Sequence, residues 1–330
     1  MKKIIFGLMA WAIICMNGYA AQTNIRALHL VIKNTEPNEI RKLINQAKDA
    51  GYNTIVLGIY NGVRFDSVKN PERAVRTWSK EEFVDVVEYA KSLQLEVVPE
   101  IKLLTHQEHL LKRSNPDYLF NSVTYDPRKL ALYTTVVFPI LDELVKLMHP
   151  KSILIGHDEV AGFNEYTRTK WLQPNEQILP ANLFLEDVLQ IHNYLKKLGI
   201  ETWMWGDMLL SENEFPTMLG RHMHGNSLGY GKPLRVRLPH DIVICDWHYL
   251  DEQIEFPSVE ALHKEGFQVL GATWEQSNTI RNFSHYAATH GAEGMIATTW
   301  SYVQRKKWDV VGSIIHESGV AFSKDFPDAR

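Results

Sequence analysis

The sequence has few cysteines and no excess of positive charge. It contains 2 cysteines among 330 residues, and 35 Lys and Arg stand against 39 Asp and Glu, for a formal net charge of −4. Domains that bind nucleic acid usually carry a basic excess, so the composition argues against a nucleic-acid partner. An internal disulfide is excluded in the mature chain, because Cys15 falls in the leader described below and only Cys245 follows it.

Long apolar runs are also scarce, and the one that exists lies at the start of the chain. Lys2 and Lys3 precede the apolar residues 4–16, and residues 17–20 (NGYA) supply the small residues of a cleavage site after Ala20. This order predicts a signal peptide over residues 1–20. No later segment is apolar enough to cross a membrane, so we expect an exported protein, periplasmic or secreted, without stable membrane insertion after the leader is removed.

Apolar segments alternate with helical patterns along residues 21–330. The predicted strands cover residues 25–32, 52–59, 95–101, 152–156, 201–205, 241–246, 267–271 and 295–299, and the predicted helices cover 37–50, 79–93, 127–148 with a kink at Pro139, 181–198, 257–265, 278–290 and 308–320. Continuous apolar strands between helices are typical of a parallel sheet covered on both faces. Eight such units predict a single (β/α)8 TIM barrel with no separate N-terminal α/β domain, and a doubly wound open sheet is the alternative.

Aromatic and charged residues follow most of the predicted strands. In a TIM barrel the chemistry occurs at the carboxyl ends of the strands, so these residues would share one site. Aromatic rings pack against the C–H faces of a sugar, and carboxylates and Lys bind its hydroxyls, so the set indicates a sugar pocket. Its members are Lys33, Asn34, Tyr60, Asn61, Lys102, His106, His157, Asp158, Glu159, Trp205, Asp207, Asp246, Trp247, Tyr249, Asp251, Trp274, Glu275, Trp300 and Tyr302.

Two adjacent acids, Asp158 and Glu159, directly follow the apolar residues 152–156 (SILIG). Neighbouring carboxylates repel each other, which tends to raise the pKa of one of them. A carboxyl group with a raised pKa can act as a general acid near neutral pH. Consecutive strand residues face opposite sides, so both acids can serve one site only if the chain turns there.

The histidines form no recognisable metal motif. His106 and His109, and likewise His222 and His224, are closely spaced, but no third ligand follows at a familiar spacing and no His-Glu-x-x-His sequence occurs. The strands are followed by no Gly-rich phosphate fingerprint, and no Gly-x-Ser-x-Gly elbow is present. We therefore expect no metal and no cofactor.

Six segments follow one another in an order known from a single enzyme family. They are residues 29–33 (HLVIK), 99–106 (PEIKLLTH), 155–160 (IGHDEV), 205–209 (WGDML), 249–251 (YLD) and Trp300. They resemble glycoside hydrolase family 20, the β-N-acetylhexosaminidases, and the first segment is similar to the subgroup related to animal hexosaminidase D. The resemblance covers nearly the whole chain after residue 20, and it implies the same TIM barrel.

The resemblance also implies a reaction and its residues. The family consists of exo-acting, retaining hydrolases of terminal GlcNAc or GalNAc, in which the 2-acetamido oxygen of the substrate attacks the anomeric carbon and forms an oxazolinium intermediate. By this resemblance Glu159 is the general acid and base, Asp158 holds the acetamido N–H, and Tyr249 donates to the acetamido oxygen. The expected substrate-binding residues are Lys33, His106, Trp205, Asp251, Trp274 and Trp300.

Three positions depart from the family pattern. Lys33 stands where most members have Arg, Asn61 where many have an Asp that pairs with the His, and Tyr302 where many have a hydroxyl-binding Glu. A non-catalytic sugar-binding protein on a glycosidase scaffold is therefore one alternative. A glycosidase with an enzyme nucleophile is another, and its candidate nucleophiles are Asp207, Asp246 and Glu275. The sequence leaves open the glycan source, the preference between GlcNAc and GalNAc, and the oligomeric state.

Overall fold

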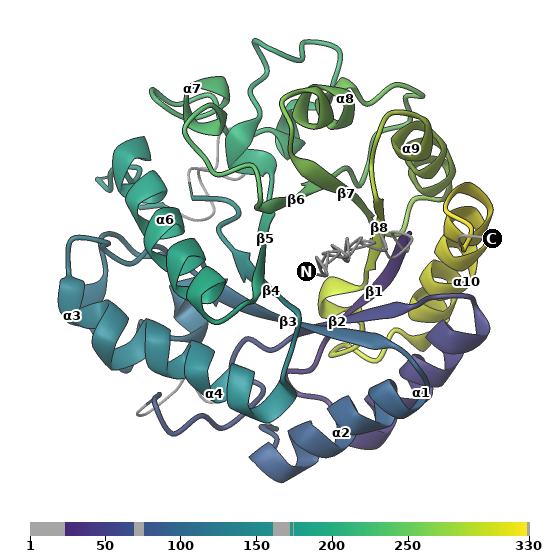
Figure 1. The fold of residues 1–330 in the computed structure, drawn as a ribbon, viewed down its shortest axis with the longest axis horizontal. Helices are drawn as coiled ribbons and strands as arrows, with labels where there is room; N and C mark the ends of the chain where they lie inside the picture. Colours follow the sequence, from purple (N-terminus) through teal and green to yellow (C-terminus); the bar gives the residue numbers. More distant parts are fainter. Residues whose placement is uncertain (1–23, 69–75, 161–171, 174, 329–330) are drawn as a thin grey trace, which may run out of the picture.

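Parallel strands close into a barrel in chain order, with β1 paired to β2 on one side and to β8 on the other (Figure 1). The computed structural model describes residues 24–68, 76–160, 172–173 and 175–328. The predicted (β/α)8 barrel is confirmed, whereas the predicted signal peptide over residues 1–20 lies outside the described residues. The strands are β1 (Ile25–Val31), β2 (Thr54–Gly58), β3 (Glu96–Leu103), β4 (Ser152–Gly156), β5 (Glu201–Trp205), β6 (Val243–Trp247), β7 (Gln268–Thr273) and β8 (Gly294–Thr298).

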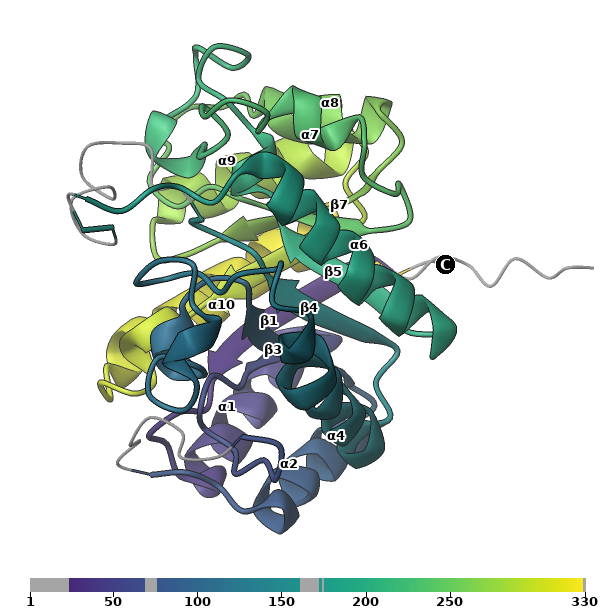
Figure 2. The ribbon, with the colours of Figure 1, turned by 90° about the vertical axis from the view of Figure 1, so that its left-hand side faces the viewer.

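Amphipathic helices cover the outside of the barrel, as Figure 2 shows for α4 and α6. In α1, for example, the buried residues recur at helical spacing and face the strands. The main helices are α1 (Pro37–Asp49), α2 (Lys80–Ser92), α4 (Phe138–Met148), α6 (Ala181–Lys197), α8 (Pro257–Lys264), α9 (Ser277–Thr289) and α10 (Trp308–Asp325), and the short ones include α3 (Leu130–Leu132) and α7 (Lys232–Arg235). No helix in the described part of the chain is long and apolar enough to span a membrane.

The helix predicted over residues 127–148 is interrupted. It begins as α3, passes through a π-helical segment, η3 (Tyr133–Val137), and continues as α4, with Pro139 in the first turn of α4. Proline has no N–H to donate to the preceding turn, and a wider turn before it accommodates this loss. The expected kink is thus a π-helical segment that lies directly before the proline.

The interior of the barrel is mainly apolar, with charged groups toward the carboxyl ends of the strands. Val56, Leu154 and Trp203 are among the buried apolar side chains that fill it. On β3 the alternation of side chains turns Glu100 and Lys102 to the same face, and both are buried. Charged groups are rarely buried unless they are paired, so this end of the barrel must supply their partners.

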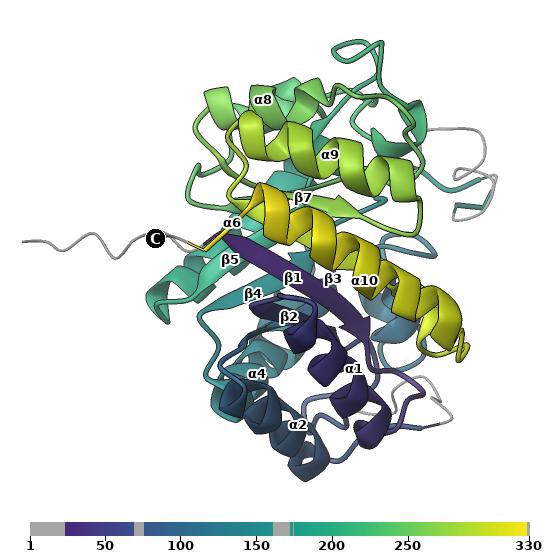
Figure 3. The same ribbon diagram turned by 90° about the vertical axis from the view of Figure 1, so that its right-hand side faces the viewer.

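The first and last described segments lie side by side, and Figure 3 shows α10 running next to β1. The guanidinium of Arg26 donates to the carbonyl of Phe326 at 2.8 Å and pairs with Asp328 at 2.7 Å. The side-chain amide of Asn24 donates to the carbonyl of Pro327 at 2.8 Å. These contacts fasten the segment after α10 to the beginning of β1.

Candidate active site

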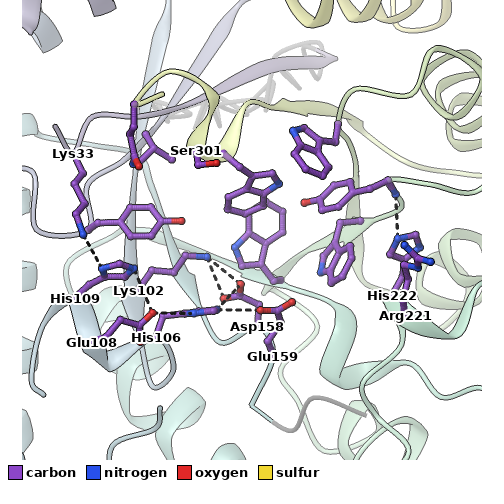
Figure 4. A pocket seen from close by; sticks show the side chains of 18 of the residues that line it. Lys33, Lys102, His106, Glu108, His109, Asp158, Glu159, Arg221, His222 and Ser301 are labelled. Atoms are coloured by element: carbon purple, nitrogen blue, oxygen red, sulfur yellow. Dashed lines mark hydrogen bonds and ion pairs between the residues drawn. The ribbon is translucent and has the colours of Figure 1, made fainter. Parts of the chain in front are cut away.

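A cavity of about 530 Å³ opens at the carboxyl ends of the barrel strands (Figure 4). Nearly all of the residues predicted to have a catalytic or substrate-binding role line it, namely Lys33, His106, Asp158, Glu159, Trp205, Tyr249, Trp274 and Trp300. The remaining one, Asp251, is buried beside the cavity and is not among the lining residues. The lining also includes three other members of the set predicted for a sugar pocket, Tyr60, Lys102 and Trp247. The other members of that set that do not line the cavity are Asn34, Asn61, His157, Asp207, Asp246, Glu275 and Tyr302. Four titratable lining residues were not predicted as part of this site, namely Glu108, His109, Arg221 and His222.

The backbone turns sharply at the end of β4. Gly156, His157 and Glu159 all have positive φ values, of 81°, 69° and 55°. This left-handed conformation is costly for residues other than glycine, and it occurs mostly where a functional site requires it. The turn removes the alternation of a strand, so Asp158 and Glu159 both reach the cavity, as one shared site requires.

A buried polar network holds this turn in place. The Asp187 carboxylate on α6 lies 2.8 Å from Nε2 of His157 and accepts a hydrogen bond from the hydroxyl of Tyr125 at 2.9 Å. Tyr133 donates to the other carboxylate oxygen. All four side chains are buried, so each needs these partners, and together they fix the residue immediately before Asp158.

Lys102 is a buried ammonium at the base of the cavity. Its Nζ lies 3.2 and 3.0 Å from the two carboxylate oxygens of Asp158 and 3.0 Å from Oε1 of Glu100. Burial alone would raise the pKa of both carboxyls. Lys102, together with His29, whose Nε2 lies 2.7 Å from Glu100 Oε2, outweighs burial and lowers the pKa of Glu100 to about 2. The pKa of Asp158 is likewise held well below its usual range, with His106 adding to the effect. Asp158 is therefore an anion at neutral pH.

The two neighbouring acids differ in protonation because their surroundings differ. Burial raises the pKa of Glu159, and His106 and His224 only partly offset the rise. His106 Nε2 lies 3.3 Å from Asp158 Oδ2 and 3.6 Å from Glu159 Oε2. Burial would lower the pKa of His106, but Asp158 raises it to about 10, so this ring is a cation. The surroundings thus favour the ionised form of Asp158 and the protonated form of Glu159.

Asp207 supports Glu159 from outside the cavity. Its Oδ2 accepts a hydrogen bond from the backbone N–H of Glu159 at 2.8 Å and lies 2.7 Å from His224 Nδ1. Its Oδ1 accepts a hydrogen bond from the indole N–H of Trp247 at 3.3 Å. The residue therefore ties the end of β4 to the aromatic side of the cavity.

Aromatic rings form the opposite side. Trp247 stacks on Tyr249 with ring centroids 4.8 Å apart, and the Tyr249 ring lies 6.0 Å from Trp274 and 6.2 Å from Trp300. The Tyr249 hydroxyl is buried, and no hydrogen-bond partner reaches it among the described residues. We call Trp205, Trp247, Tyr249, Trp274 and Trp300 the aromatic wall. We call Lys33, Lys102, His106, Glu108, Asp158 and Glu159 the charged wall.

Asp251 belongs to a separate buried cluster. Its Oδ2 lies 2.7 Å from His222 Nδ1 and 3.0 Å from His248 Nδ1, and the backbone N–H of Tyr249 donates to His222 Nε2 at 3.4 Å. A ring nitrogen that accepts a hydrogen bond leaves the proton on the other nitrogen, so His222 Nδ1 carries the proton and faces the Asp251 carboxylate. These residue types could also bind a metal, as could those of His106, Asp158 and Glu159. The expected absence of a metal stays a prediction.

Known proteins resemble this chain in both sequence pattern and fold. The family model described as glycosyl hydrolase family 20, catalytic domain, matches residues 28–314, whereas no curated protein matches. A chitobiase from Flavobacterium johnsoniae superposes with a TM-score of 0.63 at 15% identity over 92% of this chain and 50% of its own.

Two further structures show the same fold. A β-N-acetylhexosaminidase from Bacteroides fragilis NCTC 9343 gives a TM-score of 0.59 at 17% identity, covering 91% of this chain and 66% of its own. Dispersin B gives 0.60 at 16% identity, covering 92% and 99%. The chain thus spans about half to two thirds of the first two structures and nearly all of the third. With the family model covering most of its length, the chain belongs to glycosyl hydrolase family 20.

Proposed function

We propose that the protein is an exo-acting, retaining β-N-acetylhexosaminidase that removes terminal GlcNAc or GalNAc by substrate-assisted catalysis. The observation that carries the proposal is the pair of adjacent acids, one held as an anion by Lys102 and His106 and the other with a raised pKa, at a cavity with an aromatic wall. Two titratable groups whose pKa values are shifted in opposite directions by their surroundings are typical of a site with separate acid and base roles.

The roles follow from the position of each group. Glu159, with its raised pKa, protonates the glycosidic oxygen as it leaves and then, as the carboxylate, activates water. The Asp158 anion accepts the acetamido N–H and stabilises the positive charge of the oxazolinium intermediate. The buried Tyr249 hydroxyl donates to the acetamido oxygen. Because this nucleophile belongs to the bound substrate, its attack avoids much of the entropic cost of a bimolecular step.

The alternative with an enzyme nucleophile has less support. None of its candidates, Asp207, Asp246 and Glu275, is among the residues that line the cavity. Asp207 accepts the Glu159 N–H, Asp246 accepts the hydroxyl of Ser258, and Glu275 accepts the hydroxyl of Tyr302. In the described part of the chain, the carboxylates that line the cavity are Glu108, Asp158 and Glu159.

A panel of aryl β-glycosides tests the proposal. We expect hydrolysis of the 2-acetamido glycosides of glucose and galactose, no hydrolysis of the matching 2-hydroxy glycosides, and inhibition by a thiazoline mimic of the oxazolinium. Equal turnover with and without the acetamido group would assign the reaction to an enzyme nucleophile. Calorimetric binding of GlcNAc without any turnover would instead favour the non-catalytic sugar-binding protein.

The proposal also includes export of the protein from the cytoplasm. The leader pattern of residues 1–20 supports a periplasmic or secreted protein that meets N-acetylhexosamine-containing glycans outside the cytoplasm. N-terminal sequencing of the protein recovered from periplasmic and culture fractions tests this, with a first residue at position 21 expected. A protein that keeps residue 1 in the cytoplasmic fraction would contradict it.

A further inference from the structure

A short turn after β3 arranges several charged side chains along the charged wall. Leu104 and His106 have positive φ values of 63° and 55°, and the helical turn η1 (Gln107–His109) follows. The buried side chain of Gln107 donates to the carbonyls of Lys102 at 3.2 Å and of Thr105 at 2.9 Å. With Gln107 fixed inward, the residues on both sides of it line the cavity.

Glu108 lies between two histidines in this turn. Its Oε1 is 3.6 Å from His106 Nδ1 and 3.5 Å from His109 Nε2. On its other side, His109 Nδ1 lies 3.4 Å from Nζ of Lys33. Figure 4 shows these side chains in sequence along one wall, ending at the Asp158 and Glu159 pair that faces His106 Nε2. His106 is therefore placed between Glu108 on one ring nitrogen and the two catalytic acids on the other.

We propose that Glu108 is a positioning residue that acts with Asp158 to hold the His106 ring as a cation oriented toward Glu159, and so tunes proton donation to the leaving group. The proposal rests on the proposed function. It also bears on the departure at Asn61, which predicts a neutral partner for His106 where many family members have a carboxylate. The structure supplies that carboxylate from two residues further along the same turn.

The charges around His106 support this role. Asp158, Glu159 and Glu108 face its ring as acids, while Lys102 nearby opposes its protonation. Burial would raise the pKa of Glu108, but His106 lowers it to about 2, so Glu108 is an anion. Burial lowers the pKa of His109 to about 3, which leaves that ring neutral. Glu108 therefore acts electrostatically on His106, and His109 contributes no competing charge.

Leaving-group dependence separates this role from a merely structural one. A 2,4-dinitrophenyl glycoside needs little protonation as it leaves, whereas a 4-methoxyphenyl glycoside needs a general acid. In Glu108→Gln we expect kcat/KM for the methoxyphenyl β-GlcNAc substrate to fall about tenfold, and that for the dinitrophenyl substrate to change by less than about twofold. Glu108→Asp, which keeps the charge, should recover most of the loss. The matched control Glu81→Gln, at an exposed position on α2, should change neither rate.

A second measurement does not depend on activity. An NMR titration of labelled histidine should show the pKa of His106 lower in Glu108→Gln than in the wild type by about one pH unit or more, with Glu108→Asp in between. Equal loss on both substrates, no loss on either, or an unshifted His106 titration would overturn the proposal. If the wild type hydrolyses neither 2-acetamido glycoside, the proposed function fails, and the titration alone then decides whether Glu108 keeps His106 charged.

Discussion

The charged wall and the aromatic wall of the cavity come from different halves of the barrel. The charged wall follows β1, β3 and β4, whereas the aromatic wall follows β5 to β8. Ion pairs fix the first, while the second consists mainly of rings in contact with one another. The comparison suggests a division of work in which the first half supplies proton transfer and charge, while the second half holds the sugar and, through Tyr249, orients its acetamido group.

The largest effect is expected from the two acids of the charged wall. Glu159→Gln and Asp158→Asn should each lower kcat on a methoxyphenyl β-GlcNAc substrate by about a thousandfold, because one removes the proton donor and the other removes the charge opposite the oxazolinium. The matched controls are the separate substitutions Glu81→Gln and Asp117→Asn, both at exposed positions. Turnover near the wild-type rate in both Glu159→Gln and Asp158→Asn would reject the assignment of the charged wall.

Removing the ammonium between the buried acids should damage stability as well as rate. Lys102→Met removes the ammonium that Glu100 and Asp158 share and leaves His29 and His106 as their remaining ion-pair partners. Breaking a buried ion pair of this kind costs about 3 kcal/mol in the free energy of unfolding. Urea denaturation measures this cost. The exposed Lys42→Met should change the same quantity by less than about 0.5 kcal/mol. Equal stability of the two variants would show that Lys102 is dispensable to the charged wall.

The pH dependence of kcat/KM should show one descending limb, set by the raised pKa of Glu159. The reaction needs Glu159 protonated and Asp158 ionised, and burial raises the pKa of the first while Lys102 and His106 hold that of the second well below its usual range despite burial. Log kcat/KM should therefore stay level through mildly acidic pH and then fall about tenfold per pH unit above the pKa of Glu159. A profile that instead rises through about pH 4 to an alkaline plateau would reverse these roles.

The smallest effect is expected from Trp274 of the aromatic wall. Trp274→Ala removes a ring that contacts Tyr249 and Tyr302, so KM should rise about fivefold with little change in kcat. Trp308→Ala, at a partly exposed position at the start of α10, is the control. A fall in kcat at constant KM would mean that this wall also shapes the transition state, and the division between the halves would fail.

Most of the fold could be predicted from the sequence, because its signals are local. The apolar runs of the strands and the helical spacing of apolar residues, as in α1, each involve residues that are close together in the sequence. The form of the interruption before Pro139 was harder to predict. The missing N–H of proline can produce either a kink or a π-helical segment, and the sequence does not distinguish them. Chain closure was inferred from the number of units, and the pairing of β8 with β1 confirms it.

The site was harder to predict, because its contacts depend on turns and on buried charge. Glu100 and Lys102 are separated by one residue in a mainly apolar strand, so their side chains face the same side of the sheet. This spacing could have predicted a buried ion pair inside the barrel. The position of Glu108 depends on the left-handed backbone conformation of His106, which no local sequence pattern predicts. The expectation that Asp251 binds a hydroxyl stays a prediction, and its two histidine partners lie 29 and 3 positions away in the sequence.

The contacts of Arg26 and Asn24 with the segment after α10 have a consequence for chain connectivity. Those two segments already touch, and the strands form a closed ring. The cavity therefore does not depend on which strand of the ring comes first in the chain. A permuted gene that fuses position 328 to position 24 through a short linker, and opens instead at the exposed residues 212–213, would present the same two walls to a sugar.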